Sequence, residues 1–140
     1  MQVILSLDGG FDDELRHLLR RGGIRVADKE VPEFIDGRGA VNRGDIVLLD
    51  LRRHPRQAID TIKSIRRRQG FGPGIIVMTR RGDVVTTLEA LEAGADSLTH
   101  CPGTDATLVA ASIIGLGRLM GVLPQGRGVY QTGSGCGVRP

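Results

Sequence analysis

Three short apolar runs divide the chain and predict strands that are buried on both faces. They are VILSL (3–7), IVLL (46–49) and IIVM (75–78), and each contains at most one polar residue. Near-continuous runs of Val, Ile and Leu are typical of parallel strands that helices cover on both sides. Two weaker patterns, IRVAD (24–28) and SLTH (97–100), predict two further strands.

Between these runs, apolar residues recur at the three- and four-residue spacing of an amphipathic helix. Four such helices are predicted, and each ends near a glycine: residues 12–22, 56–70, 83–94 and 104–121. Asp12 and Thr104 are expected to cap the first and the last, because a side-chain oxygen there can accept from a free backbone N–H. Residues 29–43, which contain Pro32 and several glycines, predict only a short irregular helix.

The resulting order, β-α-β-(α)-β-α-β-α-β-α, implies a parallel sheet with helices on both faces. The fold class is therefore α/β, in one domain that we expect over residues 1–123. The last stretch, PQGRGVYQTGSGCGVRP (124–140), is rich in glycine and has no hydrophobic period. We expect it to be a flexible C-terminal tail.

The composition is that of an ordinary globular domain and excludes several functional classes. The apolar runs fall well short of the roughly 20 residues that a membrane span needs. Two cysteines, Cys101 and Cys136, are too few for a disulfide framework, so a reducing cytoplasm is the expected location. The net charge of +3 comes from scattered arginines with few aromatic residues, a pattern that does not predict a nucleic-acid surface.

Polar side chains are expected where three of the strands end. Asp8 follows the first strand, Asp50 ends the third, and Thr79 ends the fourth. Functional sites of open α/β sheets form at the carboxyl ends of the strands. Two carboxylates and a hydroxyl there would suit a hard cation such as Mg²⁺ and a phosphoryl group. Each residue taken alone also fits a simpler role as the cap of a strand or of the next helix.

Two longer stretches resemble the receiver domains of two-component response regulators. The first is DIVLLDL (45–51), followed by a helical apolar spacing that begins at Ala58. The second is IIVMTRRGDVVTTLEALEAGADSLTHCP (75–102), in which a strand, a threonine, a helix and the letters GAD occur in the family's order. The resemblance covers about residues 1–121. It implies a five-stranded parallel sheet in the flavodoxin-like order 2-1-3-4-5, with helices on both faces.

The resemblance also implies roles for particular residues. Asp50 matches the phosphoacceptor, whose partner is a histidine kinase or a phosphotransfer protein. Asp8, Asp50 and the backbone carbonyl of Arg52 match the protein ligands of Mg²⁺. Thr79 matches the hydroxyl that turns toward the aspartyl phosphate. Pro102 matches the proline that follows the last strand.

The chain departs from the family at several of the residues around the phosphate, which makes it an atypical receiver. Cys101 stands where the family has a lysine, and a thiol has no ammonium to offer a phosphoryl oxygen. Gly9 replaces the second metal-binding acid, and Leu98 replaces the aromatic switch residue. His54 stands where a proline is expected after the phosphoacceptor. Arg80 occupies a position that usually carries a small residue.

Two functions fit this pattern, and a third has no motif of its own. In the first, the domain is no enzyme but a single-domain response regulator that accepts phosphate on Asp50 and signals through protein contacts. Arg52, Arg80 or Arg81 then replaces the lysine, because a guanidinium can bind two oxygens. In the second, the domain is a phosphorylation-independent pseudo-receiver that keeps the fold as a protein-interaction module. Apart from both, a simpler role for Arg80 is to neutralise Asp50 by an ion pair. The third is a small enzyme that binds a phosphorylated ligand at the same strand ends.

The last predicted helix is apolar around most of its circumference. A surface helix of a small domain is expected to be apolar on one side only. We therefore expect a homodimer built around residues 106–120, with Gly115 and Gly117 allowing close backbone approach. The open alternative is that the tail folds back over this helix with Val129 and Tyr130.

Overall fold

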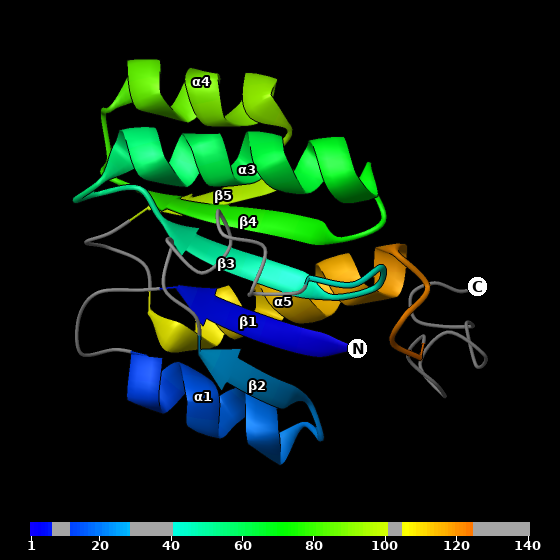
Figure 1. Cartoon of the computed structure of the whole chain (residues 1–140). Coiled ribbons are helices and arrows are strands. Elements are labelled where there is room, and N and C mark those ends of the chain that lie inside the picture. Colours follow the sequence, from blue (N-terminus) through cyan, green and yellow to red (C-terminus); the bar gives the residue numbers. More distant parts are fainter. Residues whose placement is uncertain (7–11, 29–40, 101–104, 125–140) are drawn as a thin grey trace, which may run out of the picture.

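Five parallel strands form one sheet in the computed structural model, which describes residues 1–6, 12–28, 41–100 and 105–124. The strands are β1 (Gln2–Ser6), β2 (Arg25–Asp28), β3 (Ile46–Asp50), β4 (Gly74–Thr79) and β5 (Ser97–His100). Their order across the sheet is β2-β1-β3-β4-β5, which confirms the predicted order 2-1-3-4-5 (Figure 1).

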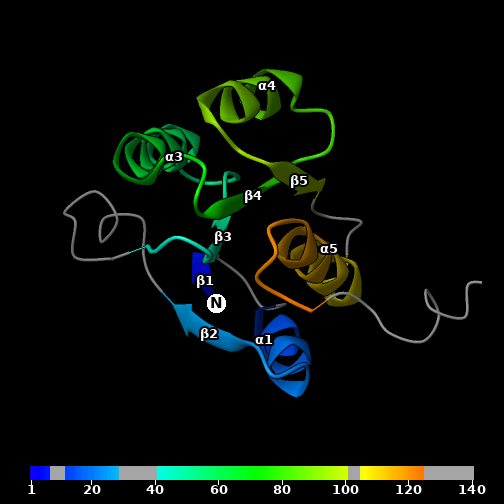
Figure 2. The same ribbon diagram turned by 90° about the vertical axis from the view of Figure 1, so that its right-hand side faces the viewer.

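Four helices cover this sheet in two layers. They are α1 (Asp12–Arg21), α3 (Pro55–Gln69), α4 (Val84–Ala93) and α5 (Ala106–Leu119). The views in Figures 1 and 2 place α3 and α4 on one face and α1 and α5 on the other. The irregular helix predicted over 29–43 falls largely on residues 29–40, which lie outside the described part of the chain. No helix in the described ranges is long and apolar enough to cross a membrane.

The two central strands are buried on both faces, as their unbroken apolar runs predict. Every residue of β3 and β4 is buried. Val47 and Leu49 pack in the cluster that contains α3 and α4. Ile46 and Leu48, which alternate with them, pack in the cluster that contains α1 and α5. Successive side chains of a strand point to opposite faces, so a strand between two helical layers needs apolar residues at every position.

The helix α3 follows its prediction, whereas α4 does not bury the face that its sequence suggests. Ile59, Ile62 and Ile65 of α3 are buried, as expected. In α4, the apolar residues at helical spacing are Val84, Leu88 and Leu91, and they are 62%, 53% and 38% exposed. The small residues of α4, led by the fully buried Ala90, contact the core instead. Apolar spacing defines a helix face, but the shape of the neighbouring layer decides which face packs.

The N-cap predicted for the last helix is wrong by one residue. Asp105, and not Thr104, caps α5, because its Oδ1 accepts from the backbone N–H of Leu108 at 2.9 Å. Both residue types are good caps, so composition alone does not distinguish them. Thr104 itself lies outside the described residues.

Much of the apolar surface of α5 is used inside the domain. Val109 and Ile113 are fully buried against the sheet. A Cβ placed on Gly117 would lie 2.6 Å from Cδ1 of Leu123, so the chain that follows α5 folds back over this glycine. Gly117 therefore offers no close approach to a partner, which corrects that part of the expectation. Gly115 faces open space, with nothing within 4 Å of such a Cβ.

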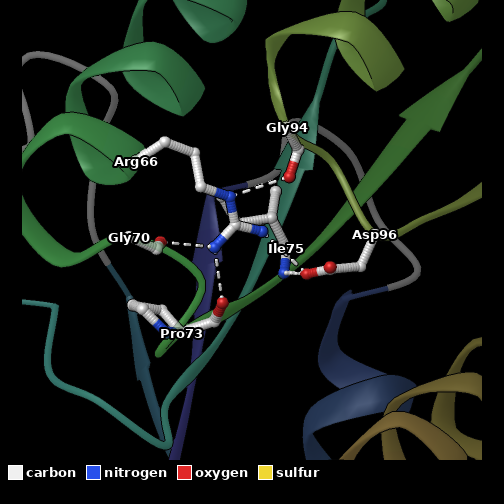
Figure 3. A network of polar contacts seen from close by, with 6 residues as sticks. All are labelled: Arg66, Gly70, Pro73, Ile75, Gly94 and Asp96. Carbon is white, nitrogen blue, oxygen red and sulfur yellow. Dashed lines mark hydrogen bonds and ion pairs between the residues drawn. The ribbon is translucent and has the colours of Figure 1, made fainter.

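One arginine ties the end of α3 to the loops that precede β4 and β5 (Figure 3). The side chain of Arg66 is only 9% exposed. Its guanidinium donates to the backbone carbonyls of Gly94, Gly70 and Pro73 at 2.8, 2.9 and 2.7 Å. Its Nη2 also pairs with Oδ2 of Asp96 at 2.8 Å. These contacts fix the turns at the amino-terminal ends of β4 and β5, and so the positions of the strands that follow.

Candidate functional site

The carboxyl ends of β3 and β4 bring Asp50 and Thr79 to the same edge of the sheet. Asp50 is level with Met78 in the parallel register, and Thr79 is the next residue along β4. The backbone N–H of Leu51 bonds to the carbonyl of Met78 at 2.9 Å, which holds the two strands together where they end. This juxtaposition is the one that the strand-end pattern predicts.

Asp50 is a buried carboxylate whose two oxygens are both bonded by Arg52. The Asp50 side chain is 4% exposed. Its Oδ1 accepts from the backbone N–H and from Nε of Arg52, both at 2.9 Å. Its Oδ2 accepts from Nη2 of Arg52 at 2.7 Å. The guanidinium therefore grips the carboxylate as a fork, which is the strongest form of this ion pair.

The local sequence explains why Arg52 reaches back in this way. An Asp at the end of a strand commonly accepts from the backbone N–H two residues on, which bends the chain into a tight turn. Leu51, between the pair, is buried and anchors this turn to the core. The Arg52 side chain is 22% exposed, so it bridges the buried carboxylate and the surface. A buried carboxylate is costly without such a counter-ion.

Thr79 has a polar neighbour that the sequence pattern did not indicate. The Thr79 side chain is buried, and its Oγ1 lies 3.3 Å from Nδ1 of His100. The two residues are level with each other across β4 and β5. His100 immediately precedes Cys101, so its place at the end of the last strand was the available signal.

The three candidate arginines differ in their surroundings. Arg52 makes the ion pair with Asp50, and Arg80 does not. Arg80 and Arg81 are exposed, and neither forms an ion pair with any residue that the structure describes. The family resemblance implies a metal-binding role for the backbone carbonyl of Arg52, whereas the structure also brings its guanidinium to Asp50.

The structure describes only some of the predicted metal ligands. Asp8, Gly9, Cys101 and Pro102 lie outside the described residues. Among those that are described, no three His, Cys, Asp or Glu side chains are grouped so that they could hold a metal ion. Asp50 is thus the one predicted side-chain ligand among the described residues.

A curated protein shares clear sequence similarity with this chain, although no family model matches it. The chain is 31% identical over 116 residues to the transcriptional regulatory protein FixJ of Azorhizobium caulinodans. The match covers 82% of this chain and 54% of FixJ. The chain thus spans about half the length of the curated relative that it matches.

Solved structures share the fold over most of the chain. The receiver domain of the TMAO respiratory system response regulator TorR has a TM-score of 0.71 and 20% identity, covering 85% of this chain and 98% of that one. FixJ-N has a TM-score of 0.63 and 20% identity, with 89% and 98% covered. A member of a family of streptococcal redox sensors that evolved from two-component response regulators has a TM-score of 0.66 and 20% identity, with 84% and 52% covered.

Fold and sequence lead to the same answer. The sheet order and the helical layers are those of solved receiver domains. The similarity to FixJ extends over most of the same residues and does not depend on the fold comparison. This chain belongs to the receiver domains of two-component response regulators.

Proposed function

We propose that Asp50 accepts a phosphoryl group and that the domain, residues 1–123, then signals through protein–protein contacts. Receiver domains are signalling partners of histidine kinases or phosphotransfer proteins rather than metabolic enzymes. The observation that carries the proposal is a buried carboxylate at the carboxyl end of a central strand, with Thr79 at the end of the next strand.

The proposed chemistry is an in-line transfer to one oxygen of Asp50. That oxygen attacks the phosphorus of a phosphohistidine on the donor protein. An O–P bond forms while the P–N bond breaks, and the electron pair of that bond returns to the imidazole nitrogen, which takes up a proton. Catalysis of such a step consists mainly of positioning and charge stabilisation.

The new phosphoryl group needs a cation, and Arg52 is the described residue best placed to supply it. Its fork already bonds both oxygens of Asp50 and suits two phosphoryl oxygens equally well. We propose that it takes over the charge role that the family gives to a lysine at the position of Cys101. Arg80 and Arg81, at the end of the neighbouring strand, are further candidates.

Mg²⁺ is the ion that receiver domains generally bind. In this chain we propose that Asp8, Asp50 and the backbone carbonyl of Arg52 would hold it, weakly. Carboxylate and carbonyl oxygens are the ligands that Mg²⁺ prefers. The ion would supply positive charge to the phosphoryl oxygens when bound. The ion would reach Asp50 only where the Arg52 guanidinium, which bonds both carboxylate oxygens in this structure, moves aside.

The test is intact mass after treatment with acetyl phosphate and Mg²⁺. We expect the native protein to gain the mass of one phosphate group and Asp50→Asn to gain none. Asp60→Asn, which removes an exposed carboxylate on α3, is the matched control and should be phosphorylated like the native protein. A native protein that gains no mass contradicts the proposal.

A second function, that of a phosphorylation-independent pseudo-receiver, is favoured by one observation. Both oxygens of Asp50 are already bonded by Arg52, so the site is neutralised from within. Receiver-like folds also serve the streptococcal redox sensors named above. A native protein that stays unmodified in the mass experiment selects this function.

We also propose a homodimer through α5, as the apolar helix suggests. Leu108 and Leu119 are 57% and 87% exposed, and their eleven-residue separation places them on one side of the helix. Burial of apolar area contributes roughly 25 cal/mol per Å², and two-fold dimers are the commonest oligomers. Light scattering should find a dimer that Leu108→Lys combined with Leu119→Lys converts to a monomer.

The matched control for this prediction is Val85→Lys combined with Leu88→Lys, which places the same two charges on α4. Val85 and Leu88 are 69% and 53% exposed. We expect this variant to remain a dimer. If it alone dissociates, the interface lies on α4, and if the native protein is monomeric at high concentration, the dimer proposal is wrong.

A further inference from the structure

We propose that the side chain of Arg52 is an intramolecular competitor of Mg²⁺, which must displace it before the ion can bind Asp50. This inference rests on the proposed role of Asp50 and adds a control of that role. The guanidinium is within 2.9 Å of both carboxylate oxygens, which are the atoms that a metal ion would need. The unphosphorylated site would thus be kept in a closed state by its own chain.

Both charge repulsion and lack of space prevent Mg²⁺ and the Arg52 guanidinium from binding Asp50 at the same time. Mg²⁺ requires oxygen ligands at about 2.0–2.1 Å in near-octahedral geometry. Asp50 is 4% exposed and holds Nε and Nη2 of Arg52 against its two oxygens. A second cation beside them would be repelled by the guanidinium at short range and in a setting with little solvent screening.

The turn that carries the pair is held by contacts that do not involve the guanidinium. Asp50 and Arg52 are two residues apart, and the turn between them is also held by the Arg52 backbone N–H at 2.9 Å from Oδ1. The buried Leu51 and its bond to Met78 fix the same turn independently of the guanidinium. The Arg52 side chain is 22% exposed and has a path to solvent. Its rotation would leave the backbone carbonyl of Arg52 in place.

A purely structural ion pair would behave differently. If Arg52 only compensated the buried charge and Mg²⁺ did not bind Asp50, its removal would destabilise the domain and leave the affinity for Mg²⁺ unchanged. A competitor predicts both a loss of stability without Mg²⁺ and a gain of affinity for the ion. The two readouts therefore separate the explanations.

The experiment is a calorimetric titration of the full chain with Mg²⁺ and no phosphodonor. We expect Arg52→Ala to bind Mg²⁺ at least tenfold more tightly than the native protein. Arg53→Ala is the matched control, because Arg53 is the next residue, is exposed and carries the same charge. It should bind like the native protein. Equal affinities of native protein and Arg52→Ala, or an equal gain in Arg53→Ala, would overturn the proposal.

A second variant and a second measurement keep the proposal testable if Arg52→Ala does not fold. Arg52→Gln keeps a hydrogen-bond donor beside Asp50 without the charge. Added Mg²⁺ should raise its melting temperature by more than it raises that of the native protein. No such difference, or no measurable binding of Mg²⁺ by either Arg52 variant, contradicts the competition.

The outcome is independent of the phosphorylation test. Tighter Mg²⁺ binding by Arg52→Ala together with no mass gain on Asp50 would remove the proposed function and leave the competition intact. Phosphorylation of Asp50, together with equal Mg²⁺ affinities of the native protein and Arg52→Ala, would support the proposed function and overturn the competition.

Discussion

Replacement of Arg66 by Met is expected to lower the free energy of unfolding by about 3 kcal/mol, because hydrogen bonds made by a charged group contribute roughly 1.5–3 kcal/mol each and Arg66 makes several. The substitution keeps the apolar stem of the side chain and removes the guanidinium. Three backbone carbonyls then lose their donor, and Asp96 loses its cation (Figure 3). Small domains have about 5–15 kcal/mol of stability in total, so this one change would remove a large part of it.

The effect is large because Asp96 has a second task. Its Oδ2, which pairs with Arg66, also accepts from the backbone N–H of Ile75 at 2.8 Å. Without the guanidinium, this carboxylate would still have to approach β4, but with no compensating charge. Arg66 therefore supports the start of a central strand as well as the loops around it.

Urea denaturation of two variants measures this prediction. Arg67→Met removes the same charge from the neighbouring position of α3, where the side chain is exposed. Surface substitutions of this kind usually change stability by about 0.5 kcal/mol or less. The explanation fails if Arg66→Met and Arg67→Met lose equal stability.

The second large effect is expected at Gly94, where substitution by Ala should cost about 2–4 kcal/mol from backbone strain and overlap together. The residue has φ of 122°, a region that side chains disfavour. A Cβ there would lie 2.7 Å from Cγ and 2.9 Å from Nε of Arg66. The new methyl group would thus push on the arginine that bonds the carbonyl of the same residue.

Gly82→Ala separates the two causes of this loss. Gly82 has φ of 89°, but nothing lies within 4 Å of a Cβ built on it. It should show the backbone strain alone. We expect Gly94→Ala to be clearly less stable than Gly82→Ala in urea, and equal midpoints would mean that the overlap with Arg66 is relieved without cost. In an Arg66→Ala background, which removes the atoms that overlap, the difference between the two glycine variants should shrink.

The strands and α3 could be predicted because their positions are determined by burial on both faces or on one face. The sheet order followed from resemblance to the receiver family, since local patterns do not encode which strands are neighbours. The outward face of α4 could not be predicted, because Val84 and Leu88 have the same spacing as core residues. Its packing was decided by the small Ala90, which fits the space beside the sheet.

At the candidate site, the strand-end pattern predicted that Asp50 and Thr79 lie at one edge of the sheet. The directions of the neighbouring side chains could not be predicted in the same way. Only the turn after β3 shows why Arg52, and not Arg80, pairs with Asp50, because this turn directs the Arg52 side chain back toward the carboxylate. Arg66 stands beside Arg67 and Arg68 in the sequence, a grouping that favours an exposed position. Its position four residues after Ile62 and seven after Ile59 places it on the buried face of α3, and that spacing was the missed signal.

The way in which the chain leaves α5 determines where any attached segment is tethered. Leu123 covers Gly117 beside Met1, and Val122 lies beside Gly44, just ahead of β3. Arg118 also donates to the carbonyl of Pro124 at 3.2 Å. These residues lie at the amino edge of the sheet, whereas Asp50 lies at the carboxyl edge (Figure 1). A polypeptide joined after residue 124 therefore starts on the opposite side of the domain from Asp50. A structural change at Asp50 would have to be transmitted along the strands, or along a helix, to reach that junction.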